Sequence, residues 1–380
     1  MIIFIIPYVY PDLHNPSGGS FIKAQAEGLA ETGNDVIVLN ATPLALKKLN
    51  LRGILKTEIK KQGEISVITL KSIGILSSKF PRTACFLYNI SLNRIFKHAV
   101  KKFGKPDVLY SHFSFPSGIC ALKYSKKYNI KLVNLEHYSL FLRSKLNYYY
   151  KNLLLKLLNN SVFLCVSEFL KNNIIKHVGI NKQITVLPNP IDDVFKFSKR
   201  TKKDRFTFLS AGNFVSSKGF EELIKAFCIA FKFNDKVILK IAGSGVLENS
   251  INNLIKQNKR ENQIEIVGRL DKKQMFELYK ECDVFVLNSE KETFSIVCRE
   301  AMAVGRPVIS RKNGGAEENF SDDFGLLIDN DKNEKTLADA LIKIYNNYSD
   351  YDLEKISKSA LTLYNKNKIM NQLNEILNFY

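Results

Sequence analysis

The sequence predicts an α/β protein made of two domains with mainly parallel sheets. Short runs rich in Val, Ile and Phe alternate with longer amphipathic stretches along the 380 residues, as in repeated βαβ units. This length exceeds the roughly 250 residues at which one hydrophobic core stops growing. A polar, charged and proline-bearing stretch, Pro188–Arg205, interrupts the pattern near its middle and predicts a linker between the domains.

The expected strands are apolar runs bounded by Gly, Pro, Asn or Asp. The first of them, MIIFIIPYVY, is only about half as long as a membrane span, so we interpret it as a buried strand. The last segment, 367–380, has the periodicity of an amphipathic helix. The expected strands are 1–8, 35–42, 65–72, 107–113, 130–138, 161–167, 184–190, 206–212, 236–245, 264–269, 283–289, 306–311 and 325–329.

Cysteine spacing and charge narrow the possible environment and partners. Six scattered cysteines without a C-x-x-C pair indicate neither a disulfide framework nor a zinc site, and they favour a reducing cytoplasm. The net charge is +19, and residues 1–190 hold 26 Lys and Arg against 9 Asp and Glu, whereas residues 191–380 hold 30 against 28. The first half is therefore expected to meet an anionic partner: a membrane surface, a nucleic acid or a phosphorylated substrate.

The stretch ETFSIVCRE places two carboxylates, Glu292 and Glu300, eight residues apart across a loop-to-helix junction. It follows the expected strand 283–289, and the helix that it opens ends at Gly305 and Pro307. A helix N-terminus at the carboxyl end of a parallel strand offers free N–H groups and a positive dipole end, which suit a phosphate. The pattern therefore predicts a phosphate-bearing ligand at this edge.

Further candidates lie at other expected strand ends. Lys218 and Gly219 follow a small-residue turn and open a helix, where a lysine reaches a phosphate as a mobile charge. Gly19 opens the first helix and would let a ligand approach the backbone. His137 and His112 lie at the carboxyl ends of neighbouring expected strands, the usual edge for binding groups.

Taken together, the motifs resemble a known family. The order S-A-G-N-x4-K-G, G-S-G, E-x7-E-A-M-A, G-x-P-V-I and G-G, with H-Y-S and P-N-P-I-D upstream, is similar to the retaining nucleotide-sugar glycosyltransferases of family 4, which have the GT-B fold. The resemblance implies two Rossmann-like domains that face each other across a cleft. Residues 1–190 would form the acceptor-side domain, completed by a returning helix at 365–380. Residues 191–364 would bind the nucleotide-sugar.

The resemblance also implies roles for individual residues. Glu292 would contact the donor sugar near its reacting carbon, Glu300 would hold the ribose hydroxyls, and Lys218 would neutralise the diphosphate. His137 would contact the donor sugar and help to stabilise charge as the glycosidic bond breaks. No metal and no cofactor beyond the nucleotide-sugar are implied. The remaining donor-site residues would be Gly19, Gly212, Asn213, Phe294, Ser295, Ile296 and Val297.

Three positions depart from the family pattern. Asn213 stands where an arginine is usual, and Thr293 and Ser295 replace glycines of the donor loop. Three consequences of these changes remain open. The protein could bind its donor more weakly, another cation such as Arg299 or Arg311 could compensate for the missing arginine, or the protein could be an inactive homologue.

We therefore expect a cytoplasmic glycosyltransferase, peripheral on the inner face of the membrane. It would move a sugar from a UDP- or GDP-sugar, with retention, to a lipid-linked or polysaccharide acceptor of lipopolysaccharide or exopolysaccharide synthesis. Two basic segments, Lys47–Lys61 and Arg143–Leu158, resemble segments that lie on an anionic bilayer, although the second equally fits a helix packed on its domain. The alternatives are a sugar-nucleotide epimerase and a nucleic-acid-binding protein; the latter lacks a recognised binding module, so no nucleic-acid partner is expected.

Overall fold

A computed structural model describes residues 1–11, 18–41, 43–45, 57–70, 72–74, 81–142, 146–179, 182–200 and 204–379. The chain divides into two compact units. Unit 1 consists of Met1–Pro190 and Lys366–Tyr380, and unit 2 consists of Ile191–Asn365. Each unit contains one large parallel sheet with helices, so the predicted α/β class with two Rossmann-like sheets is confirmed.

Unit 1 is built on an eight-stranded sheet in the order β10-β9-β8-β7-β1-β2-β5-β4. All its pairs are parallel except β4 with β5. Its central strands are buried along almost their whole length because helices cover both faces of the sheet. The strands of the sheet are β1 (Ile2–Ile6), β2 (Asp35–Asn40), β4 (Thr57–Gln62), β5 (Ile65–Leu70), β7 (Val108–His112), β8 (Lys131–Glu136), β9 (Val162–Cys165) and β10 (Thr185–Val186), and β3 (Pro43–Ala45) pairs separately with β6 (Ser72–Gly74).

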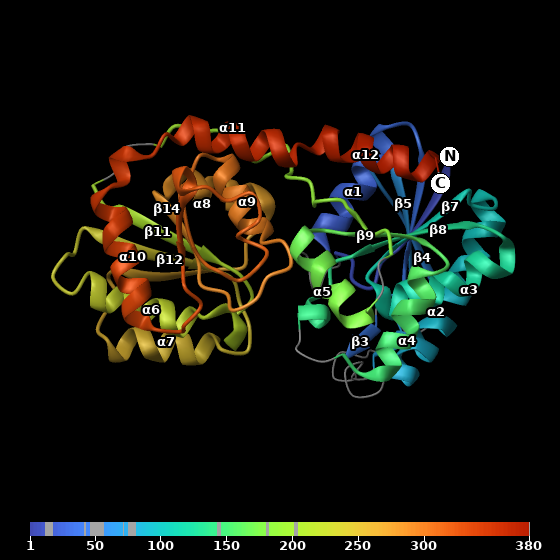
Figure 1. The fold of residues 1–380 in the computed structure, drawn as a ribbon, viewed down its shortest axis with the longest axis horizontal. Coiled ribbons are helices and arrows are strands. Elements are labelled where there is room, and N and C mark those ends of the chain that lie inside the picture. The colour runs from blue at the N-terminus through green and yellow to red at the C-terminus, as the bar shows by residue number, and fades with distance from the viewer. Residues whose placement is uncertain are drawn as a thin grey trace. The chain divides into compact units, whose positions relative to one another are not determined.

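The helices of unit 1 form two layers. The connection from β1 to β2 runs toward one edge of the sheet, whereas those through α2, α3, α4 and α5 run toward the other, so right-handed crossovers place α1 on the face opposite to them. The C-terminal helix α12 belongs to unit 1 and packs on α1 (Figure 1). The helices are α1 (Ser20–Glu31), α2 (Pro81–Phe103), α3 (Ile119–Tyr128), α4 (Tyr148–Leu158), α5 (Glu168–Val178) and α12 (Lys366–Phe379).

Unit 2 is built on a six-stranded parallel sheet in the order β13-β12-β11-β14-β15-β16. The chain winds from β11 outward to β13, then returns to β14 and winds outward the other way. Neighbouring strands β11 and β14 therefore form the topological switch point, where open α/β sheets bind ligands at the carboxyl edge. The elements are β11 (Phe206–Ala211), α6 (Phe220–Ala230), β12 (Val237–Ala242), α7 (Glu248–Gln257), β13 (Ile264–Gly268), α8 (Lys272–Glu281), β14 (Val284–Leu287), α9 (Ile296–Ala303), β15 (Val308–Arg311), β16 (Gly325–Ile328), α10 (Glu334–Asn346) and α11 (Leu353–Tyr364).

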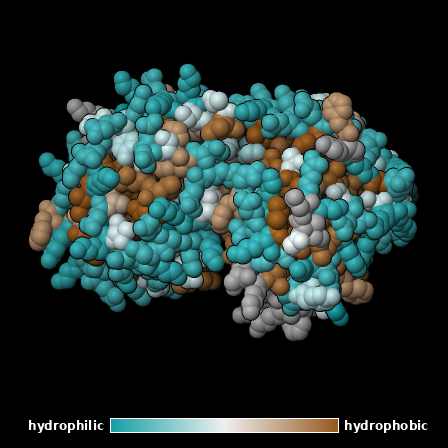
Figure 2. Space-filling view, in the orientation of Figure 1, coloured by the Kyte–Doolittle hydropathy of each residue, from teal (hydrophilic) through white to brown (hydrophobic). Residues whose placement is uncertain are grey.

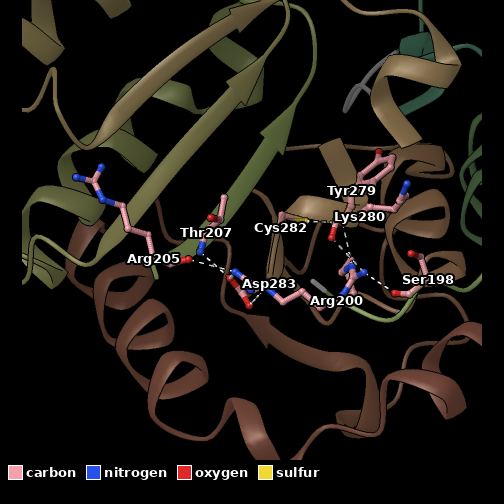
Figure 3. Close-up of polar contacts among 9 residues, drawn as sticks. Ser198, Arg200, Arg205, Thr207, Tyr279, Lys280, Cys282 and Asp283 are labelled. Carbon is pink, nitrogen blue, oxygen red and sulfur yellow. Dashed lines mark hydrogen bonds and ion pairs between the residues drawn. The ribbon is translucent and has the colours of Figure 1, made fainter. Parts of the chain in front are cut away.

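The segment that the sequence predicted as a linker is partly packed into unit 2. Phe195 is buried against the rings of Phe276 and Tyr279. Arg200 Nη2 donates to Asp283 Oδ2 at 2.6 Å, and the same oxygen accepts from the Thr207 N–H at 2.7 Å (Figure 3). Because these contacts lie where β11 and β14 begin, they stabilise the sheet edge opposite the switch-point loops.

The two basic segments, which were expected to lie on an anionic bilayer, are in part built into the fold of unit 1. The described part of Lys47–Lys61 belongs to β4, an antiparallel edge strand that the sequence analysis missed because its residues, TEIKKQ, are almost all polar. Lys47 and Lys48 lie outside the described residues. Within the second segment, Tyr148–Leu158 forms α4, which buries Leu154, Leu157 and Leu158 on its own unit.

On the face drawn in Figure 2, hydrophilic side chains cover most of the molecule and surround smaller hydrophobic areas. In the described part of the chain, no helix is both long enough and apolar enough to cross a bilayer.

Candidate functional site

The loops that follow β11 and β14 bring two predicted residues together at the switch point of unit 2. Lys218 ends a short 3-10 turn after β11, and Glu292 lies in the loop between β14 and α9. Lys218 Nζ and Glu292 Oε1 are 2.5 Å apart, and both side chains are about three-quarters or more buried. The residues are 74 positions apart in sequence, so this pair depends on the strand order.

The backbone around each partner is tightly fixed. Gly219 has a φ of 64°, and a Cβ there would lie 2.5 Å from the Asn288 carbonyl oxygen. Asn288 Nδ2 donates to the Gly219 carbonyl at 2.7 Å, while Arg311 Nε donates to Asn288 Oδ1 at 2.5 Å. The backbone of Glu292 forms an isolated parallel β-bridge with that of Gly314, and the Gly315 N–H donates to the Glu292 carbonyl at 3.0 Å. The sequence analysis missed Asn288, whose position directly after a buried strand was the available signal.

The N-terminus of α9 opens beside this pair. Its N-cap, Ser295, has a φ of 61° and makes no side-chain capping bond, so its hydroxyl does not satisfy the first N–H groups of the helix. Phe294 and Ser295 are buried, whereas Ile296 and Val297 are partly exposed. Because free N–H groups and a positive dipole end attract anions, this helix start can hold a phosphate.

Glu300 lies in the second turn of α9 and does not contact Glu292 through any bond that the structure shows. Its Oε2 accepts from Tyr279 Oη at 3.3 Å. Burial raises the pKa of Glu300 from 4.5 to about 7, against the opposing effects of Lys272 and of the Tyr279 hydrogen bond. The side chain is therefore a carboxyl group that changes charge near neutral pH.

In unit 1, two predicted histidines meet at the carboxyl edge of the sheet. His112 ends β7 and His137 follows β8, and His112 Nδ1 lies 3.1 Å from His137 Nε2. Beside them Glu136, which the sequence analysis missed, is fully buried and accepts N–H bonds from Ser114, His137 and Tyr138 at 2.7–2.9 Å. Burial raises the pKa of the Glu136 carboxyl, while these bonds lower it.

Gly19 is the N-cap residue of α1 and has a φ of 72°. The group that a Cβ would meet there is the protein's own Val9 carbonyl oxygen, at 2.5 Å. The requirement for glycine at this position is thus explained within the described residues by a close approach of two backbone segments.

Each half of the chain matches a known protein family. Residues 192–361 match the family Glycosyl transferases group 1, and residues 18–195 match Glycosyltransferase Family 4. The chain therefore carries group 1 and family 4-like glycosyltransferase domains.

Relatives of these glycosyltransferase domains include proteins of similar length. An uncharacterised glycosyltransferase of Methanocaldococcus jannaschii is 28% identical over 274 residues, which are 68% of this chain and 71% of the relative. TuaC of Bacillus subtilis, a glycosyltransferase named for teichuronic acid biosynthesis, is 26% identical over 366 residues, which are 90% of this chain and 89% of TuaC. The chain spans 37% to 47% of the length of three further glycosyltransferase relatives.

Solved structures support the same fold. Sucrose-phosphate synthase from Thermosynechococcus elongatus matches with a TM-score of 0.80 at 18% identity and covers 99% of this chain and 97% of its own. Anabaena HepE in complex with UDP matches with a TM-score of 0.74 at 17% identity and covers 100% of both chains. At these identities the similarity establishes the GT-B fold of the glycosyltransferase domains.

Within the group 1 domain, neither arginine considered as a substitute for the usual cation beside Gly212 is free. Arg299 is fully buried and donates to the carbonyls of Gly315 and Glu318 at 3.1 and 2.6 Å. Arg311 is also buried; it donates a hydrogen bond to Asn288 Oδ1 and forms an ion pair with Asp331. The proposed compensation by Arg299 is therefore not what the structure shows, because its guanidinium is committed to the loop after β15. Asn213 itself is exposed.

Proposed function

We propose that this protein transfers a sugar from a UDP- or GDP-sugar to a lipid-linked or polysaccharide acceptor in the synthesis of a cell-surface glycan. The observation that carries this proposal is the Lys218–Glu292 pair, which lies at the switch point of the group 1 domain beside the start of α9. A nucleotide-sugar donor is supported by the UDP named with HepE, and a glycan product by the teichuronic acid named with TuaC.

The pair suggests how the donor is received. In the free protein, Glu292 holds the Lys218 ammonium in a mostly buried position. A diphosphate carries more negative charge than one carboxylate, so on binding it would replace Glu292 as the partner of Lys218. Glu292 would then be released toward the donor sugar, while Lys218 and the first N–H groups of α9 hold the diphosphate. Glu300, further along α9, would accept the ribose hydroxyls.

We also propose that the reaction retains the anomeric configuration and needs no metal. The departing nucleoside diphosphate requires positive charge at its oxygens, and Lys218 with the dipole of α9 supplies it. His137 would contact the donor sugar and help to stabilise charge as the glycosidic bond breaks. Activity that survives a chelator supports a metal-free reaction, whereas strict dependence on added Mn²⁺ contradicts it.

The donor is tested by thermal-shift measurements with UDP-, GDP- and ADP-sugars, because a ligand of the folded state raises the melting temperature. We expect one of them to stabilise the wild type and the Lys225→Ala variant but not Lys218→Ala. Lys225 is a matched control because it lies on α6 in an exposed ion pair with Glu334. The mass of the product then separates transfer from epimerisation. Absence of stabilisation by any of these donors at millimolar concentration contradicts the proposal.

The acceptor side is proposed to lie on the inner face of a membrane, because among the helices of unit 1 the excess positive charge lies in one layer. Helices α2, α3, α4 and α5 carry twelve Lys and Arg against one acidic residue, whereas α1 and α12 carry three against three. Phe86, Ile90 and Tyr148 on this layer are 63%, 49% and 77% exposed. Arg82 stacks on the Tyr149 ring at 5.0 Å, which joins the starts of α2 and α4. Exposed aromatic groups among cations suit an anionic bilayer surface.

Vesicle sedimentation tests this surface. We expect wild-type protein to bind vesicles with anionic lipid at low salt, to be released as salt screens the charges, and to ignore neutral vesicles. Glutamine at Lys97, Lys101 and Lys126 should weaken binding, whereas the same change at the exposed unit 2 residues Lys232, Lys256 and Lys343 should not. Equal loss in both triple variants, or binding to neutral vesicles, contradicts a specific docking layer.

A further inference from the structure

Two of the six cysteines meet in unit 1, although they are 35 residues apart in the sequence. Cys85 lies in the second turn of α2 and Cys120 in the first turn of α3, and these two helices contact each other. Cys120 Sγ lies 3.4 Å from the carbonyl oxygen of Cys85, and the two thiols interact through a side-chain hydrogen bond. Thiols in such contact are placed to be joined by a disulfide with little movement of the helices.

The two thiols differ in exposure. Cys120 is fully buried, whereas Cys85 is only partly buried. Cys85 directly precedes Phe86, whose side chain is 63% exposed, so this turn of α2 lies at the surface of the unit. A dissolved oxidant therefore reaches Cys85 first, and Cys120 lies behind it.

The surroundings of Cys85 also favour its thiolate. The hydrogen bond from Cys120 lowers the pKa of Cys85, against the raising effect of partial burial, and the ammonium of Lys123 lowers it further. The same hydrogen bond, together with burial, raises the pKa of Cys120, so this thiol keeps its proton. Because the thiolate is the form that reacts with oxidants, Cys85 is the reactive member of the pair.

The other four cysteines, which all lie in the described part of the chain, are less reactive by the same criteria. Burial raises the pKa of Cys165, Cys282 and Cys298 to about 12. Cys228 is partly exposed like Cys85, but burial raises its pKa instead of a neighbouring thiol lowering it. Exposure and a favoured thiolate therefore coincide at Cys85, and a second thiol lies next to it.

We propose that Cys85 and Cys120 are a peroxide-sensitive redox pair that forms a reversible disulfide between α2 and α3. The Cys85 thiolate first attacks an oxygen of hydrogen peroxide: an S–O bond forms, the O–O bond breaks, hydroxide leaves and the sulfur is oxidised to a sulfenic acid. The Cys120 sulfur then attacks the Cys85 sulfur. An S–S bond forms, the S–O bond breaks, and the departing hydroxide takes the Cys120 proton to give water. A dithiol restores both thiols by disulfide exchange.

The disulfide would lie on the helical layer that is proposed to meet the membrane. Cys85 follows Arg82 by three residues and directly precedes Phe86, and both of these residues are exposed. A disulfide there would fix the start of α2 to the start of α3. Its formation needs neither a sugar nor a nucleotide, so its test is independent of the proposed function.

Peptide mapping by mass spectrometry without reduction tests the disulfide. The native wild-type protein is treated with hydrogen peroxide, and an alkylating agent then blocks the remaining thiols. We expect the peptides of Cys85 and Cys120 to be recovered joined, with the loss of two hydrogen atoms, and to separate after treatment with dithiothreitol. Absence of the joined peptide after an excess of peroxide overturns the proposal.

Variants test the order of the two steps. In Cys120→Ala the sulfenic acid of Cys85 has no resolving thiol, so dimedone, which labels sulfenic acids, should label Cys85 in this variant and much less in the wild type. In Cys85→Ala the buried Cys120 should resist peroxide. Cys228→Ala is the matched control, because it removes another partly exposed helical cysteine, and it should form the disulfide at the wild-type rate. Equal dimedone labelling of wild type and Cys120→Ala, or oxidation of Cys228 before Cys85 in the wild type, contradicts the proposal.

Discussion

Glu300 should make donor binding depend on pH, and Glu300→Gln should remove that dependence. A carboxylate that accepts ribose hydroxyls must be ionised in the complex, whereas the free group has a pKa of about 7. The free protein therefore holds a proton below pH 7 that donor binding must release. Affinity should rise as pH rises through 7 and then level off.

The size of the effect follows from that pKa. About one molecule in ten is ionised at pH 6 and nine in ten at pH 8, so the apparent Kd should be roughly tenfold higher at pH 6. Glu300→Gln keeps an oxygen for the Tyr279 hydroxyl but carries no charge. Its affinity should be independent of pH and should resemble that of the wild type at pH 6.

The assay is isothermal titration calorimetry with the donor found by the thermal-shift screen, repeated in buffers of different ionisation enthalpy to count released protons. A nucleotide diphosphate sugar is a diester, so its phosphates do not titrate between pH 6 and 8. Residues 191–365 contain no histidine, and burial raises the pKa of Cys282 and Cys298 to about 12. The same pH dependence in wild type and Glu300→Gln would refute the assignment.

Four further outcomes are expected. Lys218→Ala should slow transfer by about 10²-fold or more at subsaturating donor, measured as kcat/KM, because the diphosphate loses its cation. Glu292→Gln should chiefly lower kcat, with melting temperature as the control for a purely structural effect. Gly219→Ala should lower the free energy of unfolding by about 1–3 kcal/mol in denaturant titrations, because its φ is positive and a Cβ would meet Asn288. Asn213→Arg should hold or raise activity in the same kinetic assay; a folded but inactive variant would show that the site is built around asparagine.

The sequence by itself determined most of the sheet-forming elements and the ends at which chemistry is expected. Buried parallel strands such as β1 and β14 are continuous apolar runs, and Gly or Pro marks where they and their helices end, so local pattern is enough to find them. The same logic placed Lys218 and Glu292 in loops after strands. The local pattern did not predict the polar edge strand β4, because that segment is a strand through its pairing with β5 and not through its apolar content.

Only the tertiary structure decided which of those ends meet. Strand order brings the loops after β11 and β14 together, and with them a lysine and a glutamate 74 residues apart. It also buries Arg299 against carbonyls of Gly315 and Glu318, which removes from the donor site a cation that the sequence had offered. Side-chain type is a local property of the chain, but the partner, burial and proton of a polar group depend on strand neighbours that no short stretch of sequence contains.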